Sequence, residues 1–475
     1  MSQTRQLRAY GRRPPLPLTV PLPDGRSLEV SQWLRILPGK RLVGQAMLEG
    51  EPVLAKLFIA SGAERHWARE KQGVEALLQR AIPTPALVAS GQLVGGGRYL
   101  LTRYLPGAQS QQQRWEALQS TAPDTPAAQD LVREVIAVLA HMHRQGLTQS
   151  DLHMGNFLCY EGQLQVIDGD AVAVHTAGTP LCADEAADNL GTFMAQLPVA
   201  WEQQRDQLLA AYLQHNSEHE LDPQRISQAL ERGRAWRLRD YLGKAVRDCS
   251  LFSVRRNGWR VIAVRRSEAQ ALLPLLEQPD APFSGEPRLK DGGSSTVTRL
   301  TLDGRELVIK RYNIKGLGHW LRRFWRPSRA WHSWLAAHRL AFLDIATPAP
   351  LGMCESRFGP LRRRAWLVTE FCPGQDLLAL FDPTGAQLPS PEQQAALLQV
   401  FSELARQRIS HGDCKATNLL WHAGRVWLID LDAMQVHASE ADWRKAWSRD
   451  RARFIRNWPA ESAMGQWLQA ALPPS

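Results

Sequence analysis

One block of residues occurs twice in this chain, and the distance between its copies constrains the fold more than any other feature. SDLHMGNFLCYEGQLQVIDGDAV begins at Ser150, and GDCKATNLLWHAGRVWLIDLDAM begins at Gly412. The two blocks align without a gap, at an offset of 262 positions. A long internal repeat of this kind indicates two copies of one structural unit.

Shorter blocks upstream repeat in the same order and at similar offsets. IPTPALVASG at 82–91 matches IATPAPLG at 345–352, and VLAKLF matches LVIKRY. YLLTRYLPG and AWLVTEFCPG match between these blocks and the long one. Four blocks in one order are not a coincidence, and they predict two copies of one fold, over about 27–235 and 286–475.

Each copy shows the same order of expected elements. Two β-rich runs come first, LPGKRLVGQAML with EPVLAKLFIA and STVTRLTL with RELVIKRYN, and DGR at 303–305 is a hairpin turn. A helix is expected over 63–80 and over 328–344, because apolar residues recur there at helical spacing. Helices also follow the repeated block. This order predicts an α+β fold, with a small β-rich lobe and a mainly α lobe in each copy.

Two segments are predicted to lie outside the copies. Residues 1–26 carry basic residues and prolines, and we expect an N-terminal extension. Residues 236–285 are charged, partly strand-like and end in EQPDAPFSGEP, which predicts a connecting segment. The expected domains are therefore 27–235 and 286–475, which suits a chain of 475 residues that is too long for one ordinary core.

The bulk composition indicates the class of protein. Hydrophobic residues make up 44% and charged residues 22% of the chain, as in soluble globular proteins. No apolar run approaches the roughly 18 residues of a membrane span, and the N-terminus lacks the apolar core of a secretion signal. Six dispersed cysteines without a CxxC pair predict free thiols rather than a metal site. We therefore expect a cytoplasmic protein.

The net charge of +10 indicates an anionic partner. Arginine and tryptophan are interleaved at 320–331, 360–366 and 443–458. Such segments suit the headgroup region of a membrane, but core tryptophans with solvated arginines on amphipathic helices give the same pattern. Both interpretations stay open. No nucleic-acid partner is expected, since no recognised binding motif is present.

The repeated block also carries a chemical pattern, in which Asp-x4-Asn on a loop is followed by an aspartate at the end of a strand. Phosphoryl transfer from a nucleotide needs a cation on the phosphates, oxygen ligands for Mg²⁺, and a carboxylate that orients the attacking hydroxyl. The block supplies the carboxylates and the amide, and a lysine on an upstream strand supplies the cation. The pattern therefore predicts nucleotide-dependent phosphoryl transfer.

In the second copy, Asp413 is the expected base and Lys310 the expected phosphate-binding cation. The expected metal ligands are Asn418, Asp430 and Asp432. KDGGSSTV allows backbone N–H groups to approach phosphate, with Gly292, Gly293, Ser294 and Ser295.

The acidic partner of Lys310 stays open at this stage. Aligning the copies puts Ser333 where an acidic helix residue would stand. Glu370 is either that acid or, in better agreement with its place before Pro373-Gly374, a hinge residue beside the nucleotide.

The first copy has a parallel set of residues. Asp151 is its expected base, and Lys56 with Glu70 on the next helix forms a candidate lysine–glutamate pair for the nucleotide. Its expected metal ligands are Asn156, Asp168 and Asp170. Gln149 stands where the second copy has His411, and losing that histidine is expected to weaken the loop. Whether this copy is active stays open.

HGDCKATN…LIDLD, together with VIKRYN and IATPAPLG, resembles the lipopolysaccharide core kinases, bacterial enzymes that phosphorylate heptose or Kdo sugars of the inner core. LKDGGSSTV, IKRYNIKG and RFIRNW are also similar to that group, and the resemblance covers nearly all of 286–475 and most of 30–200. It implies two tandem protein-kinase-like, two-lobed domains that use ATP with Mg²⁺. It also implies an acceptor in the lipopolysaccharide core or a lipid-linked core intermediate, at the cytoplasmic face of the inner membrane.

Two other functions are compatible with the repeat. One is a pseudokinase pair that scaffolds or regulates core assembly, and the full set of metal ligands in both copies argues against it. The other is a kinase of another small molecule, of the aminoglycoside or choline type. The IKRYN and RFIRNW blocks argue against that second alternative, by resemblance only.

Overall fold

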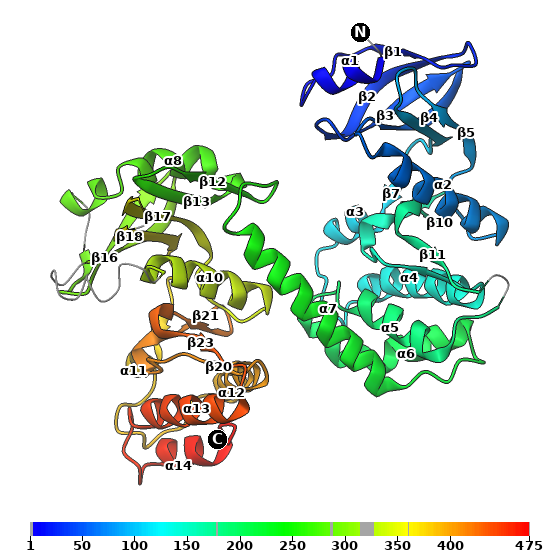
Figure 1. The fold of residues 1–475 in the computed structure, drawn as a ribbon. Helices are drawn as coiled ribbons and strands as arrows, with labels where there is room; N and C mark the ends of the chain where they lie inside the picture. The colour runs from blue at the N-terminus through cyan, green and yellow to red at the C-terminus, as the bar shows by residue number, and fades with distance from the viewer. Residues whose placement is uncertain (1–2, 177–178, 286–287, 314–326, 360, 475) are drawn as a thin grey trace. The chain divides into compact units, whose positions relative to one another are not determined.

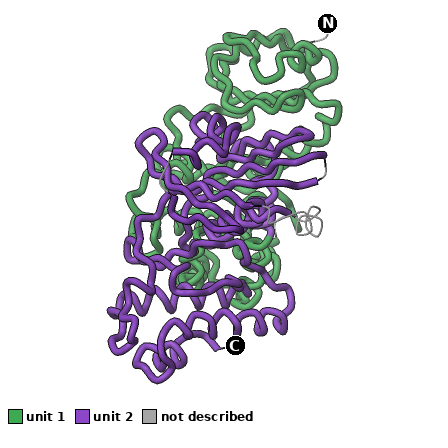
Figure 2. Tube along the Cα trace, turned by 90° about the vertical axis from the view of Figure 1, so that its left-hand side faces the viewer, with its two compact units in different colours: residues 1–235 green, residues 236–475 purple. Residues whose placement is uncertain are grey.

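The computed structural model describes residues 3–176, 179–285, 288–313, 327–359 and 361–474. The chain divides into two compact units, Met1–Ala235 and Trp236–Ser475 (Figure 2). Each unit contains an antiparallel sheet followed by a mainly helical part (Figure 1). The predicted mixture of helices and strands is confirmed.

The first unit begins with a six-stranded sheet in the order β1-β2-β3-β4-β6-β5. Its strands are β1 (Leu18–Pro21), β2 (Ser27–Leu37), β3 (Arg41–Leu48), β4 (Glu51–Phe58), β5 (Leu87–Gln92) and β6 (Arg98–Arg103). The two expected β-rich runs are β3 and β4, which pair as neighbours. Helix α1 (Gln3–Ala9) adds Leu7 to the core of this sheet, and α2 (Ala63–Gln79) packs through Ala63 on Phe58 and Leu100.

The rest of the first unit is mainly helical. Its longer helices are α3 (Gln111–Glu116), α4 (Pro126–Arg144), α5 (Ala183–Met194), α6 (Arg205–His215) and the first part of α7 (Pro223–Lys244). Its short strands are β7 (Gln109–Ser110), β8 (Leu147–Gln149), β9 (Phe157–Tyr160), β10 (Gln163–Val166) and β11 (Val172–Val174). Helix α4 buries Leu131, Val135 and Leu139, which recur every four residues and form one apolar stripe towards the core.

The second unit begins with a seven-stranded sheet in the order β12-β13-β17-β18-β16-β15-β14. Its strands are β12 (Phe252–Arg256), β13 (Arg260–Arg265), β14 (Arg288–Asp291), β15 (Ser295–Leu302), β16 (Arg305–Tyr312), β17 (Pro350–Phe358) and β18 (Leu361–Glu370). The predicted DGR turn joins β15 to β16, and Asp303 and Gly304 both have positive φ, 51° and 75°. Two central residues with positive φ give the hairpin turn whose twist matches the strands.

Helices cover both faces of this sheet. Along β13, Val261 and Ala263 contribute to the core on α10 (Arg329–Phe342), whereas Ile262 and Val264 contribute to the core on α8 (Ala269–Glu277). Successive side chains of a strand point to opposite faces, so a strand buried on both faces is apolar throughout.

The helical part of the second unit completes the fold. Its helices are α11 (Leu377–Leu380), α12 (Pro391–Arg406), α13 (Glu440–Ile455) and α14 (Ala463–Ala471). Its short strands are β19 (Gln375–Asp376), β20 (Ile409–Ser410), β21 (Leu419–His422), β22 (Arg425–Leu428) and β23 (Gln435–Val436). A capping box of Ser390 with Gln393 fixes the start of α12.

Two expected boundaries are wrong. Residues 1–26 do not form a separate extension, because β1 pairs with β2 and Leu7 packs in the core of the first unit. Residues 236–285 are not a separate connector either, because β13 pairs with β17 inside the second sheet and α8 covers one face. In the sequence, their charged and proline-containing stretches obscured the few apolar residues that cover the second face of each sheet, so the segments were not recognised as parts of the two units.

Where the structure describes the arginine–tryptophan segments, it decides between the core and the membrane-surface interpretations. Trp447 and Trp458, within 443–458, belong to the helical core of the second unit, and Trp366 is buried in its sheet. These tryptophans are core residues, so they do not offer a membrane surface. Most of 320–331 lies outside the described residues. In the part of the chain that the structure describes, no helix combines the length and apolar character needed to cross a bilayer. All six cysteines are free thiols, as expected.

Candidate active site

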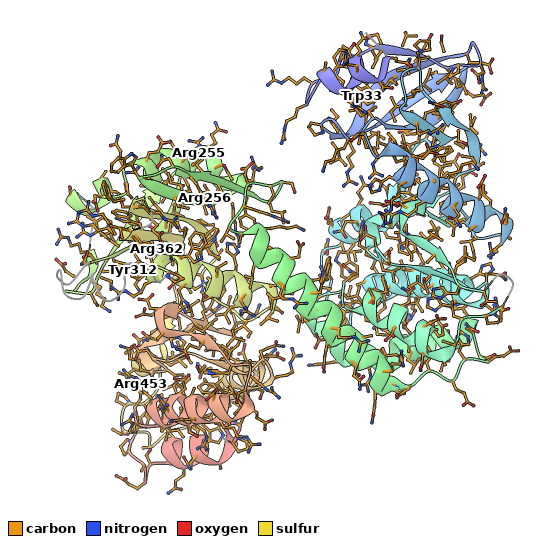
Figure 3. All side chains as sticks on the ribbon, viewed as in Figure 1. Trp33, Arg255, Arg256, Tyr312, Arg362 and Arg453 are labelled. Carbon is orange, nitrogen blue, oxygen red and sulfur yellow. The ribbon has the colours of Figure 1, made fainter. Side chains whose placement is uncertain are left out.

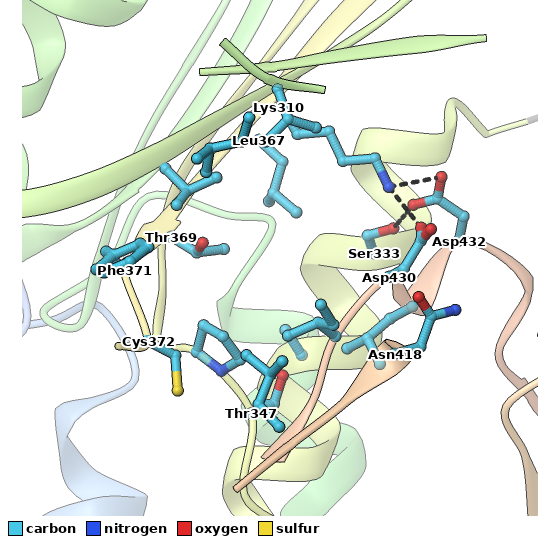
Figure 4. A pocket seen from close by; sticks show the side chains of 18 of the residues that line it. Lys310, Ser333, Thr347, Leu367, Thr369, Phe371, Cys372, Asn418, Asp430 and Asp432 are labelled. Atoms are coloured by element: carbon cyan, nitrogen blue, oxygen red, sulfur yellow. Dashed lines mark hydrogen bonds and ion pairs between the residues drawn. The ribbon is translucent and has the colours of Figure 1, made fainter. Parts of the chain in front are cut away.

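A cavity of about 480 Å³ lies between the sheet and the helical part of the second unit (Figure 4). Apolar side chains such as Val308, Leu367 and Leu420 line one part of it. Charged and polar side chains line another part, and five of them were expected site residues: Lys310, Glu370, Asn418, Asp430 and Asp432. The fold thus brings together residues that are more than a hundred positions apart.

Lys310 has two carboxylate partners in this cavity. Its Nζ lies 2.6 Å from Asp430 Oδ1 and 2.9 Å from Asp432 Oδ2. Glu370 is not its partner, because the Glu370 carboxylate pairs with Arg305 at 2.8 Å at the end of β18. The acidic group that sequence alignment could not find for Lys310 is therefore Asp432, together with Asp430.

Asp432 is held in place from two further elements. Its Oδ1 accepts hydrogen bonds from the Tyr312 hydroxyl at 2.7 Å and from Ser333 Oγ at 2.9 Å. Burial, reinforced by Asp432, raises the pKa of Tyr312 well above its usual value, so the phenol stays a proton donor. Ser333 thus stands at the helix position where an acidic residue was expected, and it binds Asp432, the acid that pairs with Lys310 instead. Because both Asp432 oxygens are engaged, this residue fits an anchor for Lys310 better than the expected metal ligand.

Asp430 keeps one oxygen for another partner. It lies at the end of β22 with a positive φ of 61°, and Asp168 has the same unusual conformation with a φ of 70°. Burial acts to raise the pKa of Asp430, but Lys310, with Lys290 and His411, outweighs it and holds the pKa below its usual value. Lys310 contacts Oδ1, which leaves Oδ2 of an ionised carboxylate beside the cavity.

The Asp-x4-Asn loop of the second unit lies between β20 and β21. The Asn418 side-chain amide donates to Asp413 O at 2.9 Å and approaches Asp413 Oδ2 at 3.3 Å. The backbone of Ile429 donates to Asn418 O at 3.0 Å, which joins the loop to the segment after β22 that carries Asp430. The amide oxygen of Asn418 and Oδ2 of Asp430 are hard oxygen donors of the kind that Mg²⁺ takes when phosphates and water complete its shell.

Hydrogen bonds of two side chains fix the start of this loop. Asp450, buried on α13, accepts from the backbone N–H groups of His411 and Gly412, at 2.5 Å and 3.0 Å. His411 Nε2 lies 2.9 Å from the carbonyl of Ile429. The charged acceptor and the ring set the turn that presents Asp413. Asp450 carries no motif of its own, so the sequence did not single it out.

Two cations flank the expected base. Arg453, on α13, lies 2.5 Å from Asp413 Oδ1, and Lys415 lies 3.6 Å from Asp413 Oδ2. Arg453 is 47% exposed, so its guanidinium can also meet a ligand from solvent. Sequence reasoning named Arg453 only as part of a basic segment, because nothing in the local pattern ties α13 to the loop.

The glycine-rich stretch forms the turn between β14 and β15. Asn313 binds this turn, since its backbone N–H donates to Ser294 O at 3.1 Å and its side chain donates to Gly292 O at 3.2 Å. The residues of this hairpin that line the cavity are Leu289, Lys290 and Val297, rather than the four expected ones: Gly292, Gly293, Ser294 and Ser295. Ser295 is buried within β15.

The first unit brings together its own parallel residues. Lys56, on β4, forms an ion pair with the buried Glu70 of α2, and its Nζ lies 3.8 Å from Asp168. Burial raises the pKa of Glu70 and Asp168 adds to the rise, while Lys56 opposes it. Glu70 also accepts from the backbone of Gly169 at 3.2 Å, which ties α2 to the segment after Asp168. The predicted lysine–glutamate pair is present here and not in the second unit.

The loop of the first unit keeps two bonds of its counterpart. The Asn156 amide donates to Asp151 O at 2.8 Å. Gln149 donates to the carbonyl of Ile167 at 3.0 Å, the same bond that His411 forms with Ile429. The expectation that losing the histidine weakens this loop is wrong for this bond, because a glutamine amide reaches the same carbonyl.

Asp170 departs from its expected role in the first unit. It pairs with Arg69 at 2.7 Å and lies 3.6 Å from His66, both on α2. Its counterpart Asp432 faces the lysine of the second unit instead. The difference follows from the neighbouring helices, which carry Glu70 in the first unit and Ser333 in the second. Only the lysine of the second unit lacks a carboxylate on that helix. Among the described residues, no group of three or more His, Cys, Asp and Glu is arranged to hold a metal by itself.

Comparison with known proteins identifies the family. A family model described as "Lipopolysaccharide kinase (Kdo/WaaP) family" matches residues 57–177 and 276–457, more than half of the chain. The chain belongs to this family. It is therefore a kinase, and the resemblance carried by HGDCKATN and LIDLD is confirmed. Both matched ranges of the chain include an Asp-x4-Asn loop.

Relatives of the chain include two curated proteins of Xylella fastidiosa, strains 9a5c and M12. Both are named 3-deoxy-D-manno-octulosonic acid kinase, and each is 26% identical over 176 residues, covering 36% of this chain and 68% of the relative. A solved structure titled "WaaP in complex with acyl carrier protein" matches with 19% identity and a TM-score of 0.31, covering 44% of this chain and 86% of that one. Vaccinia related kinase 3 matches with 11% identity and a TM-score of 0.25, covering 36% and 56%.

Proposed function

We propose that the second unit transfers a phosphoryl group from ATP to a sugar hydroxyl of the lipopolysaccharide inner core. The observation that carries this proposal is the convergence of Lys310, Asn418 and Asp430 on one cavity, with Asp413 bonded to Asn418. The apolar part of the cavity suits a nucleobase, and its charged part suits phosphates. Both units are proposed to be kinase-like, two-lobed domains, because their lysine strands and Asp-x4-Asn loops have matching local geometry.

The roles follow from the contacts. Lys310 is proposed to bind the nucleotide phosphates, with Asp432, Tyr312 and Ser333 positioning it. Asn418 and Asp430 would hold Mg²⁺, which when bound neutralises phosphate charge during transfer. Asp413 would orient the acceptor hydroxyl and accept its proton, with Arg453 and Lys415 beside it.

The acceptor is proposed to be an acidic sugar of the Kdo type rather than a neutral heptose. Arg453 stands beside Asp413 with an exposed guanidinium, where it could form a two-point contact with a carboxylate on the acceptor. The relatives from Xylella fastidiosa are named for such an acid, which supports the same choice. Since this acceptor is lipid-linked, the kinase is proposed to work at the cytoplasmic face of the inner membrane.

The first unit is proposed to be a second phosphotransfer site. Its Lys56–Glu70 pair and its Asn156–Asp151 bond supply the same functional groups. Asp151 is paired differently, since its carboxylate lies 3.7 Å from His153, whereas Asp413 pairs with Arg453 and Lys415. The two sites would therefore accept different hydroxyls or different sugars.

One experiment tests both sites. Purified full-length protein receives labelled ATP, Mg²⁺ and dephosphorylated core oligosaccharide, alongside the variants Asp413→Asn and Asp151→Asn. Removing a positioned general base lowers the rate by about 10²–10⁴-fold. We expect Asp413→Asn to abolish labelling at one hydroxyl and Asp151→Asn at another. Full labelling in the double variant would overturn the mechanism, and labelling of a heptose alone would overturn the choice of acceptor.

A further inference from the structure

Two aromatic side chains stand exposed next to each other at the edge of the second unit. Trp259 is 66% exposed and Phe358 is 55% exposed, and their ring centroids lie 5.2 Å apart. With Leu361 they border a shallow, open hollow at the tips of two hairpins. Large aromatic side chains rarely stay in water in pairs unless they serve a contact.

The hairpins hold this pair in a defined position. Trp259 follows the Asn257-Gly258 turn between β12 and β13, where the Asn257 side chain accepts from the Trp259 backbone at 2.9 Å. The backbone of Arg357 donates to Trp259 O at 2.6 Å. Gly359 donates to Gly258 O at 2.9 Å, so the two tips are bonded to each other. The aromatic pair is thus held in place by hydrogen bonds within and between the two hairpin tips.

Arginines surround the two tips. The segments 255–260 and 355–364 contain seven arginines and a single acid, Glu355, which is fully buried. Figure 3 labels three of these arginines: Arg255, Arg256 and Arg362. Two further acids reach this edge, since Glu277 pairs with Arg255 at 3.1 Å and Asp280 lies 3.7 Å from Arg364. Positive charge therefore remains in excess.

We propose that the Trp259–Phe358 edge docks on an anionic phospholipid surface. Tryptophan prefers the boundary between hydrocarbon and headgroups, and arginine binds anionic headgroups there. The edge is also linked to the catalytic end of the sheet, because Arg256 stacks on Trp331 in the first turn of α10 and Arg329 of the same turn lies 4.0 Å from Asp432. The docking surface deepens the proposed function, since it would hold the kinase where a lipid-linked acceptor lies.

The test is vesicle sedimentation of the full-length protein. The probes are vesicles of phosphatidylcholine with and without phosphatidylglycerol, at low and high salt. We expect binding to the anionic vesicles only, weakened by salt, and at least tenfold weaker for Trp259→Ala with Phe358→Ala. The matched control is Trp236→Ala, a tryptophan that is 61% exposed on arginine-rich α7, and it should bind like the wild type.

Each result either supports the proposal or overturns it. Unchanged vesicle binding by the double variant, equal loss by Trp236→Ala, or no binding by the wild type would overturn it. So would a double variant that keeps vesicle binding but loses binding to an acidic protein, which would assign the edge to a protein partner. Transfer to a soluble acceptor should stay at the wild-type rate in the double variant, which shows that it is folded. That readout also separates failure of docking from failure of the proposed kinase activity.

Discussion

The Nζ of Lys310 lies 2.9 Å from Oδ2 of Asp432, a residue 122 positions further along the chain. In the first unit, the corresponding lysine pairs with Glu70 on the neighbouring helix. The two units therefore place a carboxylate beside the strand lysine from different elements. Tyr312 and Ser333 donate hydrogen bonds that hold the Asp432 carboxylate in place. The position of this carboxylate therefore depends on residues that do not belong to one sequence motif.

Changing Asp432 should weaken nucleotide binding at the second site. Asp432→Asn removes the charge beside Lys310 and should raise the ATP KM of the transfer assigned to Asp413 by about tenfold, since a charge-assisted hydrogen bond is worth roughly 1.5–3 kcal/mol. The measurement is the ATP dependence of labelling at that hydroxyl. The matched control is Asp303→Asn, in the turn of the β15–β16 hairpin that carries Lys310. An unchanged KM would show that Asp432 does not position Lys310.

Gln149 should tolerate histidine but not alanine. Gln149→Ala leaves the carbonyl of Ile167 without its side-chain donor, and losing a partner in the interior costs about 1–3 kcal/mol. We expect faster amide exchange in the loop around Asp151. Gln149→His should keep protection near the wild-type level, because His411 forms this bond in the other unit. Equal exchange in both variants would contradict the assigned equivalence of the two side chains.

Arg453 should determine the use of the acidic acceptor. Arg453→Ala removes the proposed carboxylate contact and should raise the acceptor KM by at least about tenfold, while the ATP KM stays the same. The comparison is between Kdo-containing acceptor and the same acceptor with its carboxyl group reduced. The reduced acceptor should be used equally by the wild type and the variant. Arg449→Ala, an exposed arginine one turn earlier on α13, is the control.

If Arg453→Ala lowered the use of both acceptors alike, the arginine would act through Asp413 rather than through the acceptor. Arg453→Lys distinguishes these cases further. A lysine keeps the charge beside Asp413 but cannot form the two-point contact of a guanidinium with a carboxylate. It should therefore restore little of the acceptor affinity.

Acid should destabilise the second unit through His338. Burial, with a smaller contribution from Arg265, lowers the pKa of His338 to about 3. The unfolded chain takes up this proton near pH 6.5 and the folded unit does not, so stability falls as the pH drops below that value. At pH 5 the loss is about 2 kcal/mol. The measurement is amide exchange of α10 at pH 7 and pH 5, corrected for intrinsic rates.

His338→Gln removes the titration from this site. Its stability should therefore change less than that of the wild type between the two pH values. His338 bonds to the Tyr241 hydroxyl at 3.0 Å, so the variant is compared with itself at the two pH values rather than with the wild type at one. An equal pH dependence in both proteins would assign the effect to other groups.

Much of the local structure could be predicted from the sequence. The strands β3, β4, β15 and β16 and the helices α2 and α10 followed from alternation, helical spacing and the DGR turn, because these depend on residues close together in the chain. The same holds for the Asp-x4-Asn loops, whose internal bonds join residues five positions apart. The repeat then made one copy a guide to the other.

The tertiary structure alone decided which partner each charged residue takes. The sequence offered Glu370 as an acid for Lys310, and only the packing of η7 (Leu431–Ala433) against α10 selects Asp432 instead. The same is true of Arg453 beside Asp413 and of β13 beside β17. The sequence by itself determined the repeated elements and the chemical groups that the two copies share. Their pairing depends on contacts between distant residues, whose energies depend on burial and distance that no local pattern records.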